Sequence, residues 1–248
     1  MPDLLERLVE LEADVLYREP AGEEEPRIDS LPGTTPVLLS APHGAIHTRR
    51  GEPKEEEEFT AALARLVAEL TGAYALYTRR KSPTDPNWYR DVPYKRRLNR
   101  IAARDGIGFV LDVHGTAPSR DLGIALGTMH GRSCPEHRGL IIRLLEEHGF
   151  RRPGDAIDYP DHLDTLDVDE TFTAEGVGDQ ETVTAFAWDT LGIPSAQLEL
   201  HPGIRVVERR EDATLPRPFH GDPRRIRRTV QVLVDVVEAI SSRETTHG

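Results

Sequence analysis

The hydrophobic residues of this chain are concentrated in short runs, which are separated by longer segments with a helical pattern. Four of the runs are bounded by turn residues and predict buried strands at 37–41, 73–78, 109–113 and 196–200. A fifth run, at 122–128, predicts a weaker strand because glycines interrupt it. All of these runs are far shorter than the roughly 20 apolar residues that a membrane-spanning helix requires.

The segments between the runs carry apolar residues at helical spacing. The clearest spans 55–71, and its apolar stripe consists of Phe59, Leu63, Leu66, Val67 and Leu70. Further helices are predicted at 94–105, 136–148, 180–192 and 223–241, after a first amphipathic helix that ends before residue 19. Strands that alternate with helices indicate an α/β fold with a largely parallel or mixed sheet.

We expect a single domain over residues 1–248, because this length suits one large α/β unit. Residues 1–35 are predicted to form an N-terminal helix and loop, since 19–36 is rich in Pro, Gly and Glu. The segment 155–182 is rich in acidic residues and poor in aliphatic ones. This composition predicts an excursion over the surface or a lid.

The formal net charge of −12 narrows the classes of partner. Nucleic acids and anionic membranes require a basic surface, so neither is expected as the main partner. The acidic, amphipathic N-terminus lacks the basic start and apolar core of a signal peptide. The single cysteine, Cys134, suits a reducing compartment. We therefore expect a cytoplasmic protein, while its oligomeric state stays open.

Polar side chains capable of chemistry lie at the ends of three predicted strands. The first strand leads into His43-Gly44, the third ends at His114-Gly115, and the fourth carries Glu199. Ligands of open α/β sheets bind at the carboxyl ends of the strands. A buried carboxylate such as Glu199 is costly unless it has a role or a partner, and a salt bridge to Arg205 is the structural alternative.

These residue types predict a metal centre. Catalytic zinc takes three protein ligands, usually histidines with one carboxylate, and leaves a position for water. His43 and His114 supply two nitrogens, and the run Glu55 to Glu58 supplies the carboxylate, although acidic residues also suit the first turn of a helix. Asp112 lies two residues before His114 on the same face of the strand and is a candidate to orient an imidazole.

At these positions the sequence resembles the N-formylglutamate amidohydrolase family and its relatives in the zinc-carboxypeptidase-like fold. The motifs that carry the resemblance are APHG at 41–44, EEEEFTAAL from residue 55, DPN at 85–87, LDVHG at 111–115 and QLEL at 197–200. They extend in order over residues 36 to 205. The resemblance implies a three-layer fold with a mixed, mostly parallel sheet flanked by helices, like that of zinc peptidases and phosphorylase/hydrolase-like proteins.

The resemblance also implies one zinc ion and the roles of several residues. His43 and His114 match the two histidine ligands, and Glu199 matches a catalytic glutamate that acts as general base. Alignment of the EEEEFT motif favours Glu57 as the middle ligand, whereas helical periodicity favours Glu55 or Glu56. A glutamate three residues after the first histidine is typical of carboxypeptidases, but Ile46 stands there.

The predicted function is hydrolysis of the amide bond of an N-acyl amino acid, similar to N-formylglutamate, by metal-activated water. Asn87, Arg90 and Arg205 are the candidates for binding a substrate carboxylate or oxyanion, although ordinary surface roles are equally compatible with the two arginines. The alternatives are a metallo-carboxypeptidase, a γ-glutamyl hydrolase, or a non-catalytic ligand-binding protein of the same fold.

Nucleophilic catalysis by serine or cysteine is the less favoured chemistry. The chain contains no G-x-S-x-G motif. Cys134 precedes His137 by three residues, but both lie in a turn at a predicted helix start, where a structural role is expected.

Overall fold

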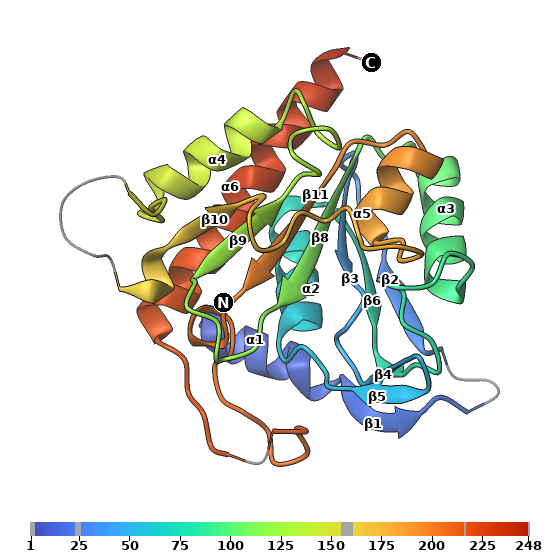
Figure 1. Ribbon diagram of the computed structural model, residues 1–248, viewed down its shortest axis with the longest axis vertical. Helices are drawn as coiled ribbons and strands as arrows, with labels where there is room; N and C mark the ends of the chain where they lie inside the picture. Colours follow the sequence, from blue (N-terminus) through green and yellow to red (C-terminus); the bar gives the residue numbers. More distant parts are fainter. Residues whose placement is uncertain (1–2, 23–25, 155–160, 216, 248) are drawn as a thin grey trace.

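The computed structural model of the protein describes residues 3–22, 26–154, 161–215 and 217–247. Its centre is a sheet formed by β2 (Ile28–Leu31), β3 (Val37–Ala41), β6 (Tyr74–Thr78), β8 (Phe109–Gly115), β9 (Ile124–Gly127), β10 (Leu166–Val168) and β11 (Ser195–Leu200). The strand order is β10-β9-β11-β8-β3-β6-β2 (Figure 1). The central strands β11, β8, β3 and β6 are parallel, whereas β9 and β2 are antiparallel to their neighbours β11 and β6.

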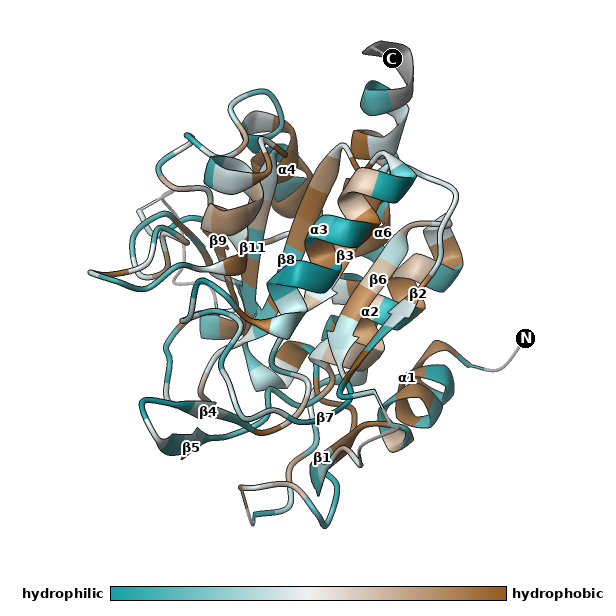
Figure 2. Ribbon diagram, turned by 90° about the vertical axis from the view of Figure 1, so that its right-hand side faces the viewer, coloured by the Kyte–Doolittle hydropathy of each residue, from teal (hydrophilic) through white to brown (hydrophobic). Residues whose placement is uncertain are grey.

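Helices cover both faces of this sheet. They are α1 (Leu4–Ala13), α2 (Thr60–Thr71), α3 (Pro93–Asp105), α4 (Arg138–Glu147), α5 (Val183–Ala185) and α6 (Pro223–His247). Helices α2 and α6 pack on one face, where α1 and α4 pack against them, and α3 and α5 cover the other face (Figures 1 and 2). The predicted three-layer α/β fold with a mixed, mostly parallel sheet is confirmed. Among the described helices, none is both long and apolar enough to cross a bilayer.

The central strands are buried on both faces, which explains why they stand out in the sequence. Leu39 and Leu111 belong to the larger core between the sheet, α2 and α6. Leu38 and Val110, one residue earlier on the same strands, belong to the second core beneath α3 and α5. Because successive side chains alternate between faces, a strand with two covered faces is apolar along most of its length.

Two further strand pairs and three short helical turns complete the elements. The pairs are β1 (Leu16–Pro20) with β7 (Arg80–Lys81), and β4 (His47–Arg49) with β5 (Glu52–Lys54). The turns are the 3-10 helices η1 (His162–Asp164) and η3 (Pro202–Ile204) and the π-helix η2 (Phe186–Thr190). The helix predicted at 180–192 is therefore a short α-helical turn followed by a π-helix.

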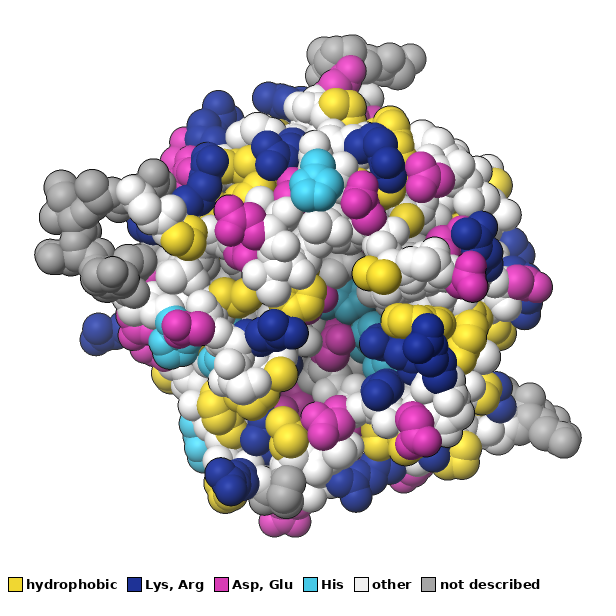
Figure 3. Space-filling model, in the orientation of Figure 1, with side chains coloured by type: hydrophobic (Ala, Val, Ile, Leu, Met, Phe, Trp, Pro, Cys, Tyr) yellow, Lys and Arg dark blue, Asp and Glu magenta, His cyan; other side chains and the backbone are white. Residues whose placement is uncertain are grey.

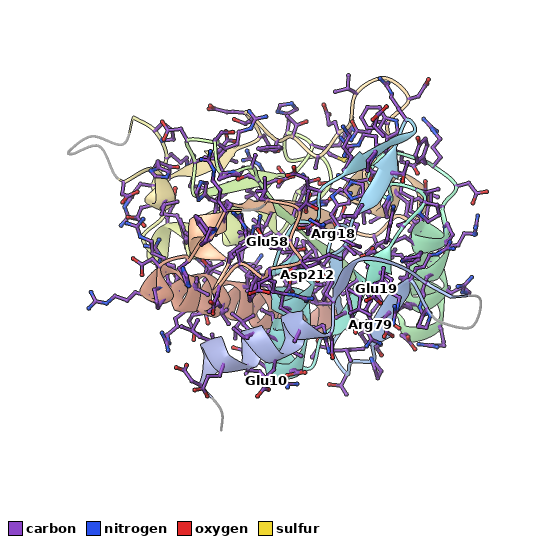
Figure 4. All side chains as sticks on the ribbon, turned by 90° about the horizontal axis from the view of Figure 1, so that it is seen from below. Glu10, Arg18, Glu19, Glu58, Arg79 and Asp212 are labelled. Atoms are coloured by element: carbon purple, nitrogen blue, oxygen red, sulfur yellow. The ribbon has the colours of Figure 1, made fainter. Side chains whose placement is uncertain are left out.

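The prediction that a helix begins at residue 55 is wrong, because α2 begins only at Thr60. The preceding residue, Phe59, has a left-handed backbone with φ of 64°. The glutamates before it are engaged in tertiary contacts instead: Glu56 accepts hydrogen bonds from Thr214, and Glu58 forms an ion pair of 2.8 Å with Arg209. Figure 4, seen from below, labels Glu58 and also Asp212, which belongs to the segment that carries Arg209.

Two predicted loops also contain strands. The segment 19–36 includes β2, which pairs with β6 at the edge of the sheet. The segment 155–182 includes β10, which pairs with β9 at the opposite edge, so part of it belongs to the sheet rather than to a surface excursion. Residues 155–160 of that segment lie outside the described residues. Both strands are short and only partly buried, so their hydrophobic pattern in the sequence is weak.

Candidate metal centre and active site

The candidate site lies where three adjacent parallel strands end. β3 leads through Pro42 to His43, β8 carries His114 near its end, and β11 carries Glu199. In the sheet β8 lies between β3 and β11, and the Cα atoms of Glu199 and His114 are paired across the ladder. The strand order thus brings together side chains that are far apart in the sequence.

The carboxylate of Glu57 lies between the two histidines. Its Oε1 is 2.7 Å from Nδ1 of His43, and its Oε2 is 3.1 Å from Nδ1 of His114. The backbone N–H of Gly115 donates to the same Oε2 at 2.9 Å. The backbone N–H of Glu57 in turn donates to the carbonyl of His43 at 2.8 Å, which holds the acidic turn against the end of β3.

A buried carboxylate orients each of the two imidazoles from behind. Nε2 of His43 is 2.8 Å from Asp85 Oδ1, and Nε2 of His114 is 2.9 Å from Asp112 Oδ2. Both rings are therefore fixed with Nδ1 directed to Glu57. Histidine ligands of metal ions are held in this way, with the second nitrogen donating to a carboxylate.

The pKa shifts of His43, His114 and Glu57 show that the carboxylates of this group favour positive charge between them. Burial lowers the pKa of His43, but the carboxylates of Glu57 and Asp85 outweigh it and raise the pKa to about 9. Burial likewise opposes the charge of His114, yet Asp112 and Glu57 raise its pKa well above the usual value. The positive charges of the two imidazoles lower the pKa of Glu57 although burial raises it.

The three side chains fit a divalent cation. One ligand atom each from His43, Glu57 and His114 lie within 4.8 Å of one another, and two nitrogens with one carboxylate are a common ligand set of catalytic zinc. A second group of this kind consists of His43, His47 and Asp85. It is less suited to a cation, because the Arg49 guanidinium already donates through Nε to Asp85 Oδ2 at 2.5 Å.

Glu199 is buried beside this group with 7% of its surface exposed. Its Oε1 accepts a hydrogen bond of 2.8 Å from the side chain of Gln197. Burial raises the pKa of Glu199 to about 7, and repulsion from Glu57 adds to the effect while His114 opposes it. Glu199 forms no salt bridge with Arg205, whose guanidinium donates to backbone carbonyls. With its pKa raised to about 7, the carboxyl group of Glu199 can exchange a proton near neutral pH.

These residues form the floor of a cavity of about 370 Å³, which we call the site cavity. Figure 3 shows a hollow near the middle of this face, with histidine and acidic side chains inside it and basic side chains on its rim. Its walls come from the turn after β8 and from the segment 171–182, and they include the residues Arg49, Asn87, Arg120, Thr173, Gln180 and Gln197.

The predicted substrate-binding residues have different positions. Asn87 lines the site cavity; its Oδ1 accepts a hydrogen bond from Val183 N, and its Nδ2 has no partner among the described residues. Arg90 is exposed and is not part of the cavity wall. Arg205 is buried, and its guanidinium donates to the backbone carbonyls of Glu58, Leu200 and Thr116, so it braces the site from outside the cavity.

Sequence reasoning missed four residues that surround the site. Asp85 belongs to the DPN motif, but nothing in that motif indicated that it would contact His43. Arg49 and Arg120 are two arginines among many, and only the fold brings them to the cavity. Gln197 was within reach of sequence reasoning, because alternation along β11 directs it to the same face as Glu199.

The cysteine alternative receives no support from the structure. Cys134 is fully buried, and burial raises the pKa of its thiol to about 12. His137 is buried as well, and its Nε2 is 2.9 Å from Glu244 of α6. A neutral, fully buried thiol is a poor nucleophile.

Comparison with known proteins gives a likeness of fold. No family model and no curated protein matches the sequence. The N-formylglutamate amidohydrolase from Ralstonia eutropha JMP134 has 14% sequence identity and a TM-score of 0.54, and the match covers 88% of this chain and 99% of that one. A bacteriophage poly-gamma-glutamate hydrolase has 13% identity and a TM-score of 0.47, with 84% and 86% of the two chains covered. A metallo-carboxypeptidase from Burkholderia cenocepacia has 13% identity and a TM-score of 0.43, with 91% and 67% covered. The chain therefore has the fold of the Ralstonia eutropha enzyme, as the resemblance in the sequence predicted.

Proposed function

We propose that the protein is a metal-dependent amidohydrolase that cleaves the amide bond of an N-acyl amino acid, with N-formylglutamate as the reference substrate. The observation that carries the proposal is the convergence of His43 Nδ1, His114 Nδ1 and the Glu57 carboxylate beside Glu199. The fold shared with an N-formylglutamate amidohydrolase supports it.

In this proposal His43, Glu57 and His114 hold one zinc ion. Zinc in such a site lowers the pKa of bound water to about 7 and polarises a carbonyl oxygen. Asp85 and Asp112 keep the two imidazoles in the tautomer that presents Nδ1 to the ion. Glu57 also receives the N–H of Gly115, which fixes the orientation of its carboxylate.

Glu199 is the proposed general base. Its carboxylate takes a proton from the attacking water as the new C–O bond forms, and it delivers this proton to the nitrogen as the C–N bond breaks. A pKa near 7 suits both transfers, because the group accepts and releases protons at the same pH. Gln197 holds Oε1 of this carboxylate and leaves Oε2 free for the transfer.

Arg49 and Asn87 are the proposed contacts for the carboxylate of the substrate or for the developing oxyanion. The guanidinium of Arg49 is anchored through Nε to Asp85 and lies over the ring of Trp88, and its two Nη groups have no hydrogen-bond partner among the described residues. Asn87 offers its unpartnered Nδ2 in the same cavity. Arg120 lines the cavity as well, and its guanidinium lies over the ring of Phe172. These groups replace Arg90 and Arg205 as candidates.

The test combines metal analysis with a substrate panel. The purified protein is expected to contain one equivalent of zinc, to lose hydrolysis when the metal is chelated, and to regain it when zinc is restored. The panel includes N-formyl, N-acetyl and γ-glutamyl amides together with a peptide that has a free C-terminus. Preference for the peptide or the γ-glutamyl amide favours the two alternative hydrolases. Metal binding without turnover of any member favours a binding protein and contradicts the proposal.

A further inference from the structure

A second cavity lies behind the loop that supports the candidate site. It has a volume of about 390 Å³ and is lined by β2 with Gly22, Pro26 and Arg27 before it, by the loop 82–86 and by the first turns of α3. Thr84 and Pro86 line this cavity, whereas Asp85 between them is directed to the other side and contacts His43 and Arg49. The two cavities share no lining residue. Its volume is within the range of small-molecule sites.

Among the described residues, the charged side chains that line this second cavity, which we call the arginine cavity, are all basic. Its basic residues are Arg27, before β2, and Arg97 and Arg100, one turn apart on α3. Arg97 donates one hydrogen bond to Ser30 at 2.8 Å, and the side chains of Arg27 and Arg100 have no hydrogen bond or ion pair among the described residues. No Asp or Glu lines the cavity in the part of the chain that the structure describes, which leaves out Glu23, Glu24 and Glu25.

Other arginines of the same helix behave differently. Arg96 is paired with Asp91, and Arg104 is paired with Asp105 at 2.6 Å. In a chain with a net charge of −12, carboxylates are plentiful, yet the three arginines of the cavity lack one. Unopposed guanidinium groups in a concave site favour carboxylate or phosphate oxygens, which they bind bidentately.

The rest of the wall is apolar. It includes Ile28, Pro83, Pro86, Pro93 and the ring of Tyr94. The hydroxyl of Tyr94 is already hydrogen-bonded to Leu76 O at 2.7 Å and to Ser40 at 2.9 Å, so only the body of this side chain is available to a ligand. A ligand that matches both parts of the wall has an anionic end and a compact apolar body.

We propose that the arginine cavity binds a small organic oxyanion, a carboxylate or phosphate ester with an apolar body, and that this ligand restrains the loop carrying Asp85. Figure 1 shows β2 and α3 next to each other at one side of the molecule, where the ligand bridges them. Ser82, Thr84 and Pro86 contact the ligand from the loop, and Asp85 transmits the restraint to His43 and Arg49. The site is regulatory in its effect on the proposed function, although its binding does not depend on that function.

Binding is measured by isothermal titration calorimetry with phenyl phosphate and benzoate, which distinguish a phosphate from a carboxylate. Two comparison compounds are titrated in the same way: benzyl alcohol, which lacks the charge, and inorganic phosphate, which lacks the apolar body. The double variant Arg97→Ala/Arg100→Ala is expected to weaken the tighter anion at least 10-fold. The matched control Arg96→Ala/Arg104→Ala removes two arginines of the same helix that line neither cavity and is expected to bind as the wild type does.

A second variant separates the two cavities. Arg120→Ala removes an arginine that lines the site cavity and not the arginine cavity, and it is expected to retain the anion. Unchanged binding in Arg97→Ala/Arg100→Ala overturns the proposal, as does loss of binding in Arg120→Ala, equal weakening in the Arg96→Ala/Arg104→Ala control, or no binding to the wild type. These outcomes do not involve turnover, so they are independent of whether the protein is an amidohydrolase.

The restraint on the loop has its own measurement. In the Trp188→Phe protein, Trp88 is the single tryptophan, and it lies three residues after Asp85 with Arg49 and Arg50 over its ring. Saturation with the bound anion is expected to change the fluorescence of Trp88, and Arg97→Ala/Arg100→Ala is expected to abolish that change. Calorimetric binding with no change in Trp88 emission overturns the coupling.

Discussion

Glu199 and His114 are direct neighbours on the parallel strands β11 and β8, with their Cα atoms paired in the ladder. Two residues earlier the same ladder pairs Gln197 with Asp112. Because side chains alternate along a strand, all four lie on one face of the sheet. The strand pair thus places the proposed base, Glu199, and a proposed metal ligand, His114, side by side near the carboxyl ends of the strands. Gln197 and Asp112, which hydrogen-bond to them, lie two residues earlier.

Replacement of the proposed base separates proton transfer from metal binding. Glu199→Gln keeps the size of the side chain and removes its proton-accepting group, so we expect full zinc content and a kcat lower by roughly 100-fold or more. The control Glu57→Gln is expected to lose zinc affinity as well as activity. Metal analysis and steady-state kinetics on both variants provide the test, and wild-type turnover by Glu199→Gln would exclude it as the base.

Loss of the carboxylates behind the imidazoles should weaken metal binding without removing a ligand. For Asp85→Asn and Asp112→Asn we expect zinc affinity to fall roughly 10- to 100-fold, since the hydrogen bonds that orient His43 and His114 lose their charge. Competition with a chromogenic chelator measures the affinity. Asp91→Asn is the matched control, because Asp91 is exposed and is paired with Arg96. Unchanged zinc affinity in both variants would contradict the proposed ligand set.

Arg49 should act on the affinity for anionic substrates. Its charge-assisted hydrogen bonds with a carboxylate are worth roughly 1.5–3 kcal/mol, so Arg49→Ala is expected to lower kcat/KM roughly 10- to 100-fold for the N-acyl amino acid. The amide of the same substrate, which lacks the carboxylate, should be affected less. Arg50→Ala is the control, because Arg50 stacks on Trp88 but does not line the site cavity. Equal effects on the acid and the amide would assign Arg49 to another role.

Glu12 should make stability depend on pH. This carboxyl group is 1% exposed, its Oε1 accepts hydrogen bonds from Tyr17 and from Phe59 N, and burial raises its pKa from 4.5 to about 7. A folded-state pKa above the unfolded value stabilises the fold fully below pH 4.5, and this contribution is lost as the pH rises through 7. The free energy of unfolding should therefore fall by roughly 3 kcal/mol over this interval relative to that of Glu12→Gln.

Urea denaturation of the wild type and of Glu12→Gln at several pH values between 4.5 and 8 measures this difference. The control is Glu10→Gln, which changes an exposed glutamate of the same helix (Figure 4). Its profile should be parallel to that of the wild type. If the profile of Glu12→Gln were parallel as well, the protonation of Glu12 would not differ between the folded and unfolded states.

The central strands were predictable from the sequence, and the edges were not. β3, β8 and β11 are buried along nearly their whole length, and apolar residues make up most of β3 and β8 and alternate with polar ones in β11. β2 and β10 have three or four residues and are only partly buried, so their pattern does not differ from that of a loop. Their place in the sheet depends on pairing with strands distant in sequence, which local periodicity does not record.

The same distinction applies to the site. His43, His114 and Glu199 follow or end buried strands, where a polar residue is conspicuous. For the middle ligand, helical periodicity favours Glu55 or Glu56, but these residues are not helical because α2 begins only after this run. The motif alignment favours Glu57, whose carboxylate lies between the two histidines. The arginines could not be sorted from the sequence, since a guanidinium on a cavity wall and one on open surface have the same local pattern.

Asp85 contacts a proposed metal ligand with one oxygen and a proposed substrate-binding arginine with the other. The proposed binding of the ion and the proposed binding of the substrate consequently depend on the position of the same carboxylate. A change that shifts this carboxylate alters both at once, so variants of Asp85 and Arg49 should not combine additively. On the proposed function, any adaptation of the protein to a differently shaped acid must also preserve the binding of the proposed metal ion.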